Sequence, residues 1–167
     1  MNLTLILLRH AKSGWDDPEG ADHGRTLTDR GQTAARRIGI WLRQNDHVPD
    51  RIIASDATRT GQTVAGVMDR LGAMPQVSYL RALYHASPDA ILRQIGLVTD
   101  AQTLLVCGHN PGIGDLAGRL VTSHPDHPRF ADYPTAATTV IRFDATQWSA
   151  LRKGTCIAFM TPADLAD

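Results

Sequence analysis

Short apolar runs and stretches of helical periodicity alternate along the chain. Leu3 to Leu8 is a short apolar run, which is typical of a strand buried on both faces. Similar runs predict further strands over residues 51–54, 77–80, 103–107, 138–143 and 155–160. Between them, apolar residues at helical spacing predict helices from Thr28-Asp29 to residue 44 and over residues 58–71, 88–98 and 113–120.

Strands that alternate with helices in this way predict an α/β fold. Such folds are three-layer sandwiches in which helices flank a mostly parallel central sheet. At 167 residues the chain has the size of one domain. The segment 123–134 contains Pro125, Pro128 and Pro134 and is predicted to be a surface loop, and no repeat or linker divides the sequence. We therefore expect a single domain over residues 1–167.

Charge and composition limit the partners that the chain could bind. Lys plus Arg and Asp plus Glu both total 17, so no net field would attract nucleic acid or an anionic membrane. The opening apolar run lacks a preceding basic region and stops at Arg9, which makes it too short for a signal peptide or a membrane span. Cys107 and Cys156 lie in apolar, strand-like runs, where a cysteine usually packs. These features favour a soluble, cytoplasmic protein in which any anion site is built locally.

Three polar clusters directly follow three of the most apolar strands. They are Arg9-His10, the segment from Ser55 to Arg59, and Gly108-His109-Asn110. Ligands of an open α/β sheet bind beyond the carboxyl ends of its strands, so this topology would bring all three clusters to one edge. Two arginines and two histidines that converge there would form a site for a doubly charged tetrahedral anion, and helix N-termini would add backbone N–H groups.

Each cluster has a simpler explanation when it is taken alone. An Arg-His pair after a strand is usually a surface turn, and the peptide GHNPG can also be a turn. Three such clusters at corresponding strand ends favour the functional interpretation. The remaining histidines lie in polar or proline-rich stretches and are expected to be solvated: His23, His47, His85, His124 and His127. The sequence contains neither HExxH nor paired CxxC, so no metal site is expected.

The motifs in these clusters resemble those of the histidine phosphatase (phosphoglycerate-mutase-like) superfamily. RHA ends the first strand, LTDRG opens a helix, RTGQT follows the second strand, and LYHASPD and VCGHNPG come later in the same order. Longer stretches, including RHAKSGWDD, GHNPGIGDLA, YPTAA and FMTPADL, are most similar to the short SixA-type phosphohistidine phosphatases. The resemblance spans nearly the whole chain and implies a phosphatase that needs no cofactor.

The resemblance also implies a role for each matching residue. His10 would be the nucleophile, and Arg9 beside it would bind phosphate. Arg59, in RTGQT, would be the second phosphate-binding arginine, and His109 would be a second, protonated histidine. The expected substrate-binding residues are Arg9, Ser13, Arg59, His109 and Asn110. The reaction would consist of two in-line displacements, first onto His10 and then onto water.

One position departs from the pattern of the superfamily. Many of its members carry a glutamate, the general acid, three residues before the tyrosine of the LY segment. Counting back from Tyr84 gives Arg81 in this sequence. An acid could instead come from the loop that contains Asp16, Asp17, Glu19 and Asp22, and the spacing does not select one of them.

Three functions are compatible with these residues. The first is hydrolysis of phosphohistidine on a protein, through a covalent intermediate on His10. The second is hydrolysis of a small phosphomonoester or of another phosphoprotein. The third is an inactive domain that binds phosphorylated partners, which the presence of both histidines and both arginines disfavours. In each case the partner carries a phosphoryl group and is neither nucleic acid nor membrane.

Overall fold

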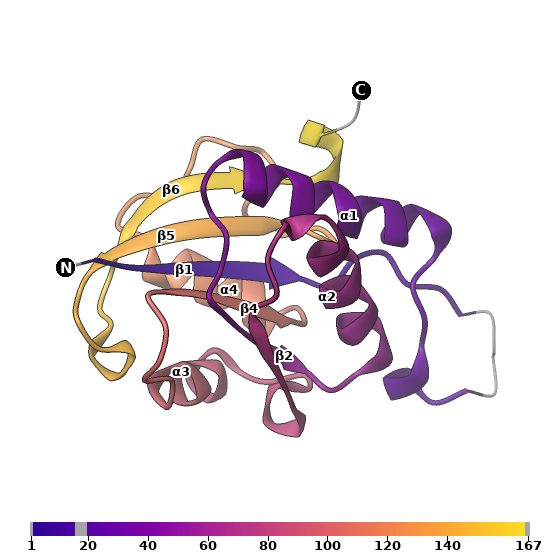
Figure 1. Cartoon of the computed structure of the whole chain (residues 1–167), viewed down its shortest axis with the longest axis horizontal. Helices are drawn as coiled ribbons and strands as arrows, with labels where there is room; N and C mark the ends of the chain where they lie inside the picture. The colour runs from indigo at the N-terminus through magenta and orange to yellow at the C-terminus, as the bar shows by residue number, and fades with distance from the viewer. Residues whose placement is uncertain (1, 16–19, 166–167) are drawn as a thin grey trace.

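A six-stranded sheet forms the middle of the molecule, and helices cover both of its faces (Figure 1). The computed structural model describes residues 2–15 and 20–165. The strands are β1 (Asn2–Arg9), β2 (Arg51–Ser55), β3 (Gln76–Leu80), β4 (Thr103–Gly108), β5 (Thr138–Asp144) and β6 (Thr155–Met160). The α-helices are α1 (Asp29–Gln44), α2 (Thr58–Leu71), α3 (Pro88–Gly96) and α4 (Gly112–Leu120). The short 3₁₀ helices are η1 (Asp22–Gly24), η2 (Arg81–Leu83), η3 (Trp148–Ala150) and η4 (Pro162–Leu165).

The sheet is mixed but mostly parallel. Its strands lie in the order β3-β2-β4-β1-β5-β6. The strands from β3 to β1 are parallel, β5 runs antiparallel to β1, and β6 runs antiparallel to β5. The α/β architecture predicted from the sequence, with helices flanking a mostly parallel sheet, is confirmed. The parallel strands place their carboxyl ends at one edge, where the polar clusters follow them.

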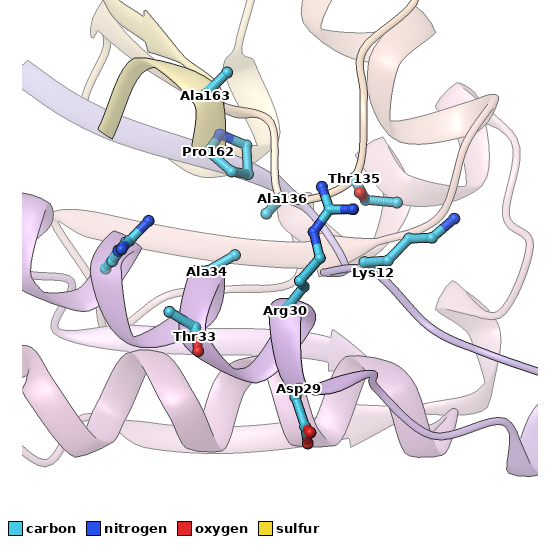
Figure 2. A pocket seen from close by; sticks show the side chains of 10 residues that line it. Lys12, Asp29, Arg30, Thr33, Ala34, Thr135, Ala136, Pro162 and Ala163 are labelled. Carbon is cyan, nitrogen blue, oxygen red and sulfur yellow. The ribbon is translucent and has the colours of Figure 1, made fainter. Parts of the chain in front are cut away.

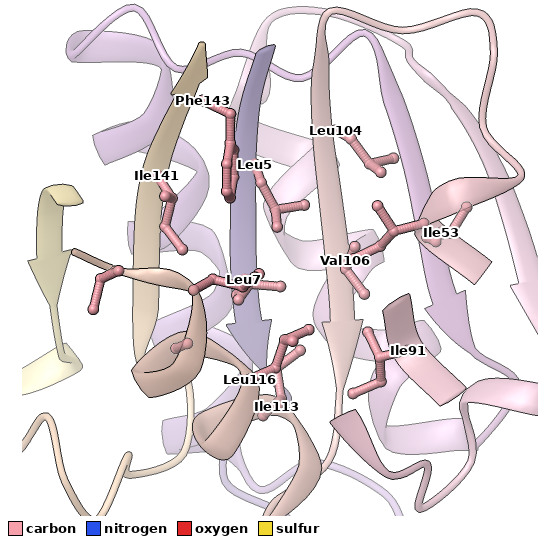
Figure 3. Packing of buried hydrophobic residues seen from close by; sticks show 14 of the residues in the cluster. Leu5, Leu7, Ile53, Ile91, Leu104, Val106, Ile113, Leu116, Ile141 and Phe143 are labelled. Carbon is pink, nitrogen blue, oxygen red and sulfur yellow. The ribbon is translucent and has the colours of Figure 1, made fainter. Parts of the chain in front are cut away.

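Successive residues of β1 pack into two separate cores. Leu5 and Leu7 lie in the core beneath α3 and α4, which Figure 3 shows. Ile6 and Leu8 lie in the core beneath α1 and α2, together with the free thiol of Cys107. Because helices cover both faces, the middle of this strand has no solvent-facing side, which explains its apolar run.

Local signals in the sequence set the ends of the helices. The Thr28 hydroxyl caps α1 by accepting a hydrogen bond of 3.1 Å from the Gly31 N–H. Gly72 follows α2 with a φ of 75°, a left-handed conformation that favours glycine. Ser87 caps α3, which ends at Gly96, earlier than predicted. None of the described helices is long and apolar enough to cross a membrane.

Candidate active site

The three polar clusters meet at the carboxyl edge of the parallel strands. Arg9 of β1 lies opposite Gly108 of β4, and the His10 N–H donates to the Gly108 carbonyl at 3.0 Å. The rings of His10 and His109 are consequently neighbours, with 5.3 Å between their centroids. Between the clusters is a hollow of about 200 Å³, which we call the catalytic hollow. It is lined by Arg9, His10, Lys12, Ser13, Arg25, Arg59, His85, His109, Asn110 and Thr135.

The His10 ring is held as a neutral group whose second nitrogen keeps a lone pair without a partner among the described residues. Its Nδ1 lies 2.8 Å from the Ala11 carbonyl oxygen, which can only accept, so Nδ1 carries the hydrogen and Nε2 carries the lone pair. Burial lowers the pKa of His10 to about 4, and the charges of Arg59 and Arg9 act in the same direction against the opposing Ala11 hydrogen bond. The ring is therefore neutral near pH 7, as a nucleophile requires.

Two arginines bring fixed positive charge to the hollow. The Arg9 guanidinium donates through Nη1 to the Tyr133 carbonyl at 3.0 Å. Arg59 is 1% exposed, and its Nη1 donates to the Asp22 carbonyl at 2.7 Å. The Nε atoms of both arginines are buried and have no hydrogen-bond partner among the described residues. Both arginines line the hollow, and guanidinium groups there fit a tetrahedral oxyanion.

The second histidine is also neutral in this arrangement. Arg59 donates through Nη2 to His109 Nδ1 at 3.2 Å, so the hydrogen of the ring lies on Nε2. That Nε2–H donates to the Ser55 hydroxyl oxygen at 2.8 Å. Burial lowers the pKa of His109 to about 3, and His10 and Arg59 add to the effect. The structure therefore differs from the protonated form that we expected, because the ring is buried beside cations.

Asp22 supplies a carboxylate behind the hollow and is held by four side chains. Its Oδ2 accepts from Arg59 at 3.1 Å and lies 2.9 Å from His85 Nε2, and it also accepts from the Tyr84 hydroxyl. Its Oδ1 accepts from Arg25 at 3.1 Å. Burial alone would raise the pKa of Asp22, but these hydrogen bonds outweigh it and hold the pKa far below its usual range. The carboxylate is thus fixed in its ionised form.

Asp22 is accordingly a poor general acid, because it does not carry a proton near neutral pH. The other acids considered for that role, Asp16, Asp17 and Glu19, lie outside the described residues. No carboxylate is among the described residues that line the catalytic hollow. Arg81 lies on η2 with its guanidinium 4.8 Å from the centre of the Tyr84 ring.

Ser13 and Asn110 contact neighbouring parts of the protein. The Ser13 hydroxyl is buried and accepts from Arg25 Nη2 at 2.8 Å. The Asn110 amide donates to the Tyr133 carbonyl at 2.9 Å and accepts from the Gly114 N–H at 3.1 Å. Both ends of this amide are engaged with backbone, so the structure gives Asn110 the position of a residue that fixes the loop against Arg9.

Comparisons with known proteins agree with this geometry. The model of the histidine phosphatase superfamily (branch 1) matches residues 5–83. The structure of a candidate phosphohistidine phosphatase SixA from Nakamurella multipartitia superposes with a TM-score of 0.81, at 31% identity and with 97% of each chain covered. The chain belongs to the histidine phosphatase superfamily. It is SixA-like, as the sequence motifs predicted.

Two further relatives of this histidine phosphatase extend the comparison. An uncharacterised protein of Mycobacterium tuberculosis is 36% identical over 160 residues, which are 92% of this chain and 96% of the relative. The protein histidine phosphatase SixA, solved in complex with tungstate, has the same fold with a TM-score of 0.80 at 22% identity. That match covers 98% of this chain and 100% of the other.

Sequence reasoning missed four residues that line the hollow of this histidine phosphatase: Lys12, Arg25, His85 and Thr135. His85 is exposed, as expected of a surface residue, but its ring also lines the hollow, with its centroid 4.7 Å from that of His109. The reason is that β3 lies beside β2, and the segment after it returns over the same edge of the sheet. The position of LYHASPD after a parallel strand was the signal that could have found it. Arg25 carries no comparable signal, because it follows no strand.

Proposed function

We propose that this chain hydrolyses phosphohistidine on a protein, through a covalent intermediate on His10. The observation that carries the proposal is the His10 ring itself, neutral and with its Nε2 lone pair unengaged by any described residue. It lies in one hollow with Arg9 and Arg59, each of which has a buried N–H without a partner in the described chain. A nucleophile beside two guanidinium groups that can bind phosphoryl oxygens is the arrangement that phosphoryl transfer needs.

The proposed reaction has two in-line steps. In the first, His10 Nε2 attacks phosphorus and the bond from phosphorus to the substrate imidazole breaks. That imidazole leaves neutral, with the proton that its other ring nitrogen has taken from solvent beforehand. In the second, water attacks phosphorus, the bond to His10 breaks, and inorganic phosphate leaves. Arg9 and Arg59 hold the phosphoryl oxygens in both steps and neutralise the charge that develops on them.

Phosphohistidine is the preferred substrate because of the proton that the leaving group needs. An alkyl ester expels an alkoxide, for which a positioned general acid contributes about 10²–10⁴-fold in rate. Arg81 stands where many relatives have a glutamate, and Asp22 is held ionised. An imidazole leaving group has an ordinary pKa near 6.5 and readily takes its proton at neutral pH. The SixA designations of the Nakamurella protein and of the tungstate complex support the same substrate class.

His85 supports a second candidate function, hydrolysis of a small phosphomonoester. Its ring lines the catalytic hollow, and its Nε2 shares a hydrogen bond with the Asp22 carboxylate at 2.9 Å. An imidazole oriented by a carboxylate is a common general acid. In that case His85, in place of the absent glutamate, would protonate the leaving oxygen.

Trapping the phosphoenzyme tests the proposed nucleophile. Brief incubation of the wild-type protein with a ³²P-labelled phosphohistidine protein should leave acid-labile label on the enzyme. His10→Ala should carry none and lose turnover, whereas His47→Ala, which changes a histidine outside the hollow, should behave as wild type. Substantial turnover by folded His10→Ala would remove His10 from the nucleophilic role.

A substrate series separates the two candidate functions. We expect kcat/KM to be highest for a phosphohistidine protein, intermediate for an aryl phosphate and lowest for an alkyl phosphate. The gap between the first and last should be about 10²–10⁴-fold, the value of the missing acid. If an alkyl phosphate is the best substrate and His85→Ala abolishes that activity, the second candidate is correct and the first is wrong.

A further inference from the structure

A second hollow, larger than the catalytic one, lies between the start of α1 and the chain that follows β6. Its volume is about 550 Å³. Arg30 of α1 lies on one side and Pro162 and Ala163 on the other, with Lys12 beside Thr135 (Figure 2). Arg37 and Ala136 also line the hollow. We call this hollow the α1 groove. None of its residues has a role in the reaction described above.

The α1 groove adjoins the catalytic hollow. Lys12 and Thr135 line both of them. The Lys12 carbonyl accepts hydrogen bonds from the backbone N–H of Thr28 at 2.9 Å and from its hydroxyl at 3.2 Å. These bonds hold the chain that follows His10 against the start of α1. A substrate whose phosphoryl group lies at His10 therefore has the α1 groove as its neighbouring surface.

The charge of the α1 groove is strongly positive in a chain without net charge. Lys and Arg together equal Asp and Glu at 17 each over the whole sequence, yet the groove has three cations and one carboxylate, Asp29. In Figure 2 the Arg30 side chain extends toward Thr135, whereas the Asp29 carboxylate points the opposite way. No ion pair links Lys12, Arg30 or Arg37 to a carboxylate of the described residues. The groove is therefore able to accept negative charge from a ligand.

The spacing of these cations selects an extended ligand. Arg30 and Arg37 are seven residues apart on α1, which corresponds to a rise of about 10.5 Å. About three residues of extended polypeptide cover that length, so one extended segment can contact both guanidinium groups. Arginine forks bind carboxylates in two-point contacts, and the apolar wall opposite can contact aliphatic parts of the same segment.

We propose that the α1 groove binds acidic side chains of the substrate protein, next to its phosphohistidine. This inference rests on the proposed function, because it places the phosphoryl group at His10. It assigns substrate selection to a surface outside the catalytic hollow. Proteins with glutamates or aspartates beside the phosphohistidine would be preferred over neutral ones. Salt would weaken the preference because Lys12 and Arg30 are solvent-exposed.

Two peptides and two charge-reversal variants test this inference. The peptides have equal length and one phosphohistidine, flanked by glutamates in one and by glutamines in the other. The test variant is Arg30→Glu/Arg37→Glu, and the matched control is Arg36→Glu/Arg43→Glu, on the same helix with the same spacing. Like Arg30 and Arg37, the control pair has one exposed and one half-buried side chain, but neither lines the α1 groove.

We expect wild type and the control to hydrolyse the acidic peptide with a kcat/KM at least tenfold above that for the neutral peptide at low salt. The test variant should lose this preference, and all three proteins should hydrolyse phosphoramidate, which has no flanking segment, at the same rate. Equal kcat/KM for the two peptides in wild type would overturn the inference and leave the proposed function intact. The same holds if the test variant keeps the preference, or if the control loses it as well.

A binding measurement keeps the inference testable independently of turnover. Fluorescence anisotropy of a labelled acidic peptide without the phosphoryl group reports on the α1 groove alone. Wild type and the control should bind it about tenfold more tightly than the test variant does. Absence of this difference contradicts the inference even if turnover is normal. Failure to hydrolyse any phosphohistidine substrate contradicts the proposed function. The binding measurement then decides whether the α1 groove binds acidic segments.

Discussion

Arg59 is a buried cation whose guanidinium has three different tasks. It bonds the backbone and side chain of Asp22, it donates to the His109 ring, and it keeps one buried N–H without a partner in the described chain. Its position at the start of α2, directly after β2, makes it part of the edge where the parallel strands end. The catalytic hollow thus depends on one side chain for both charge and shape.

Removing the Arg59 guanidinium should lower kcat far more than removing an arginine outside the catalytic hollow. Arg59→Ala is expected to lower kcat by roughly 10²–10³-fold, because one preorganised set of donors to the transition state is lost. Arg59→Lys, which keeps the charge but lacks the fork, should recover part of the rate. Arg51→Ala, which removes a guanidinium bonded to Ser78 on β3, is the control and should retain the wild-type kcat when folded. Unchanged vanadate affinity in Arg59→Ala would remove this residue from the site.

Neutralising Asp22 should have opposite effects on stability and on anion binding. Asp22→Asn leaves Arg59 without its counter-charge, so the free energy of unfolding should fall by about 1–3 kcal/mol. The loss stays below that of a fully buried pair because the Asp22 side chain is 36% exposed. Phosphate should bind the variant more tightly, since no carboxylate competes for Arg59. Calorimetric titration with phosphate measures this, and weaker binding would contradict it.

At the scale of elements, the junction between β4 and α4 determines how closely the segment with His85 approaches. Gly112 opens α4, and a Cβ placed there would lie 1.9 Å from the Ala86 carbonyl oxygen. Gly118 is in the same helix, and a Cβ there would meet only ordinary contacts with His124 at 3.8 Å. The first glycine is required by a close approach, and the second is not.

Alanine at these two glycines should therefore change stability in opposite directions. Gly112→Ala must displace the chain beside His85 and should lower the free energy of unfolding by about 1–3 kcal/mol, with loss of activity. Gly118→Ala should raise it by about 0.5–1 kcal/mol, because alanine favours the helix. Urea denaturation of both variants provides the measurement. The same sign for both would show that the contact with the Ala86 carbonyl does not limit the packing.

Helices and strands were predictable because their signals are local. Thr28, Gly72 and Pro88 lie at helix ends. The burial of β1 on both faces is visible in the sequence as an apolar run. The order of the strands is not local, because it depends on which faces pack across the sheet. For that reason the position of His85 at the hollow was missed. Nothing in LYHASPD alone indicates that β3 pairs with β2 and that the chain after β3 returns to the hollow.

The motifs likewise could not predict the protonation states of the two histidines. They placed His10 and His109 at one edge, but the pKa of each ring depends on burial and on neighbouring charge. The carboxylate beside Arg59 was also only one of four acids in a loop, and contacts with Arg25, Tyr84 and His85 are what distinguish Asp22.

On the scale of the whole molecule, the two neutral histidines make folding sensitive to acid. In the unfolded chain both rings titrate near pH 6.5. In the folded protein the pKa of His10 is about 4 and that of His109 about 3. Above pH 6.5 the rings are neutral in both the folded and the unfolded state, so their protonation does not lower the free energy of unfolding. Below it, protons bind the unfolded chain first and shift the equilibrium toward unfolding.

The free energy of unfolding should therefore fall between pH 6.5 and about 4, by up to about 1.4 kcal/mol per pH unit for each histidine. Urea denaturation at pH 7.5, 6 and 5 measures this slope. His10→Gln should remove the share that His10 contributes to this slope. An identical slope in wild type and His10→Gln would contradict the burial-induced pKa shift.

The carboxylate of Asp22 balances the charge of the Arg59 guanidinium. A guanidinium that is 1% exposed is unstable without an anion, and between turnovers Asp22 is that anion. In the proposed reaction, an incoming phosphoryl group would compete with this carboxylate for Arg59, so binding would not require desolvation of an unpaired cation. Once phosphate departs, the carboxylate would again neutralise the guanidinium. This competition would lower the affinity for substrate and favour release of the product.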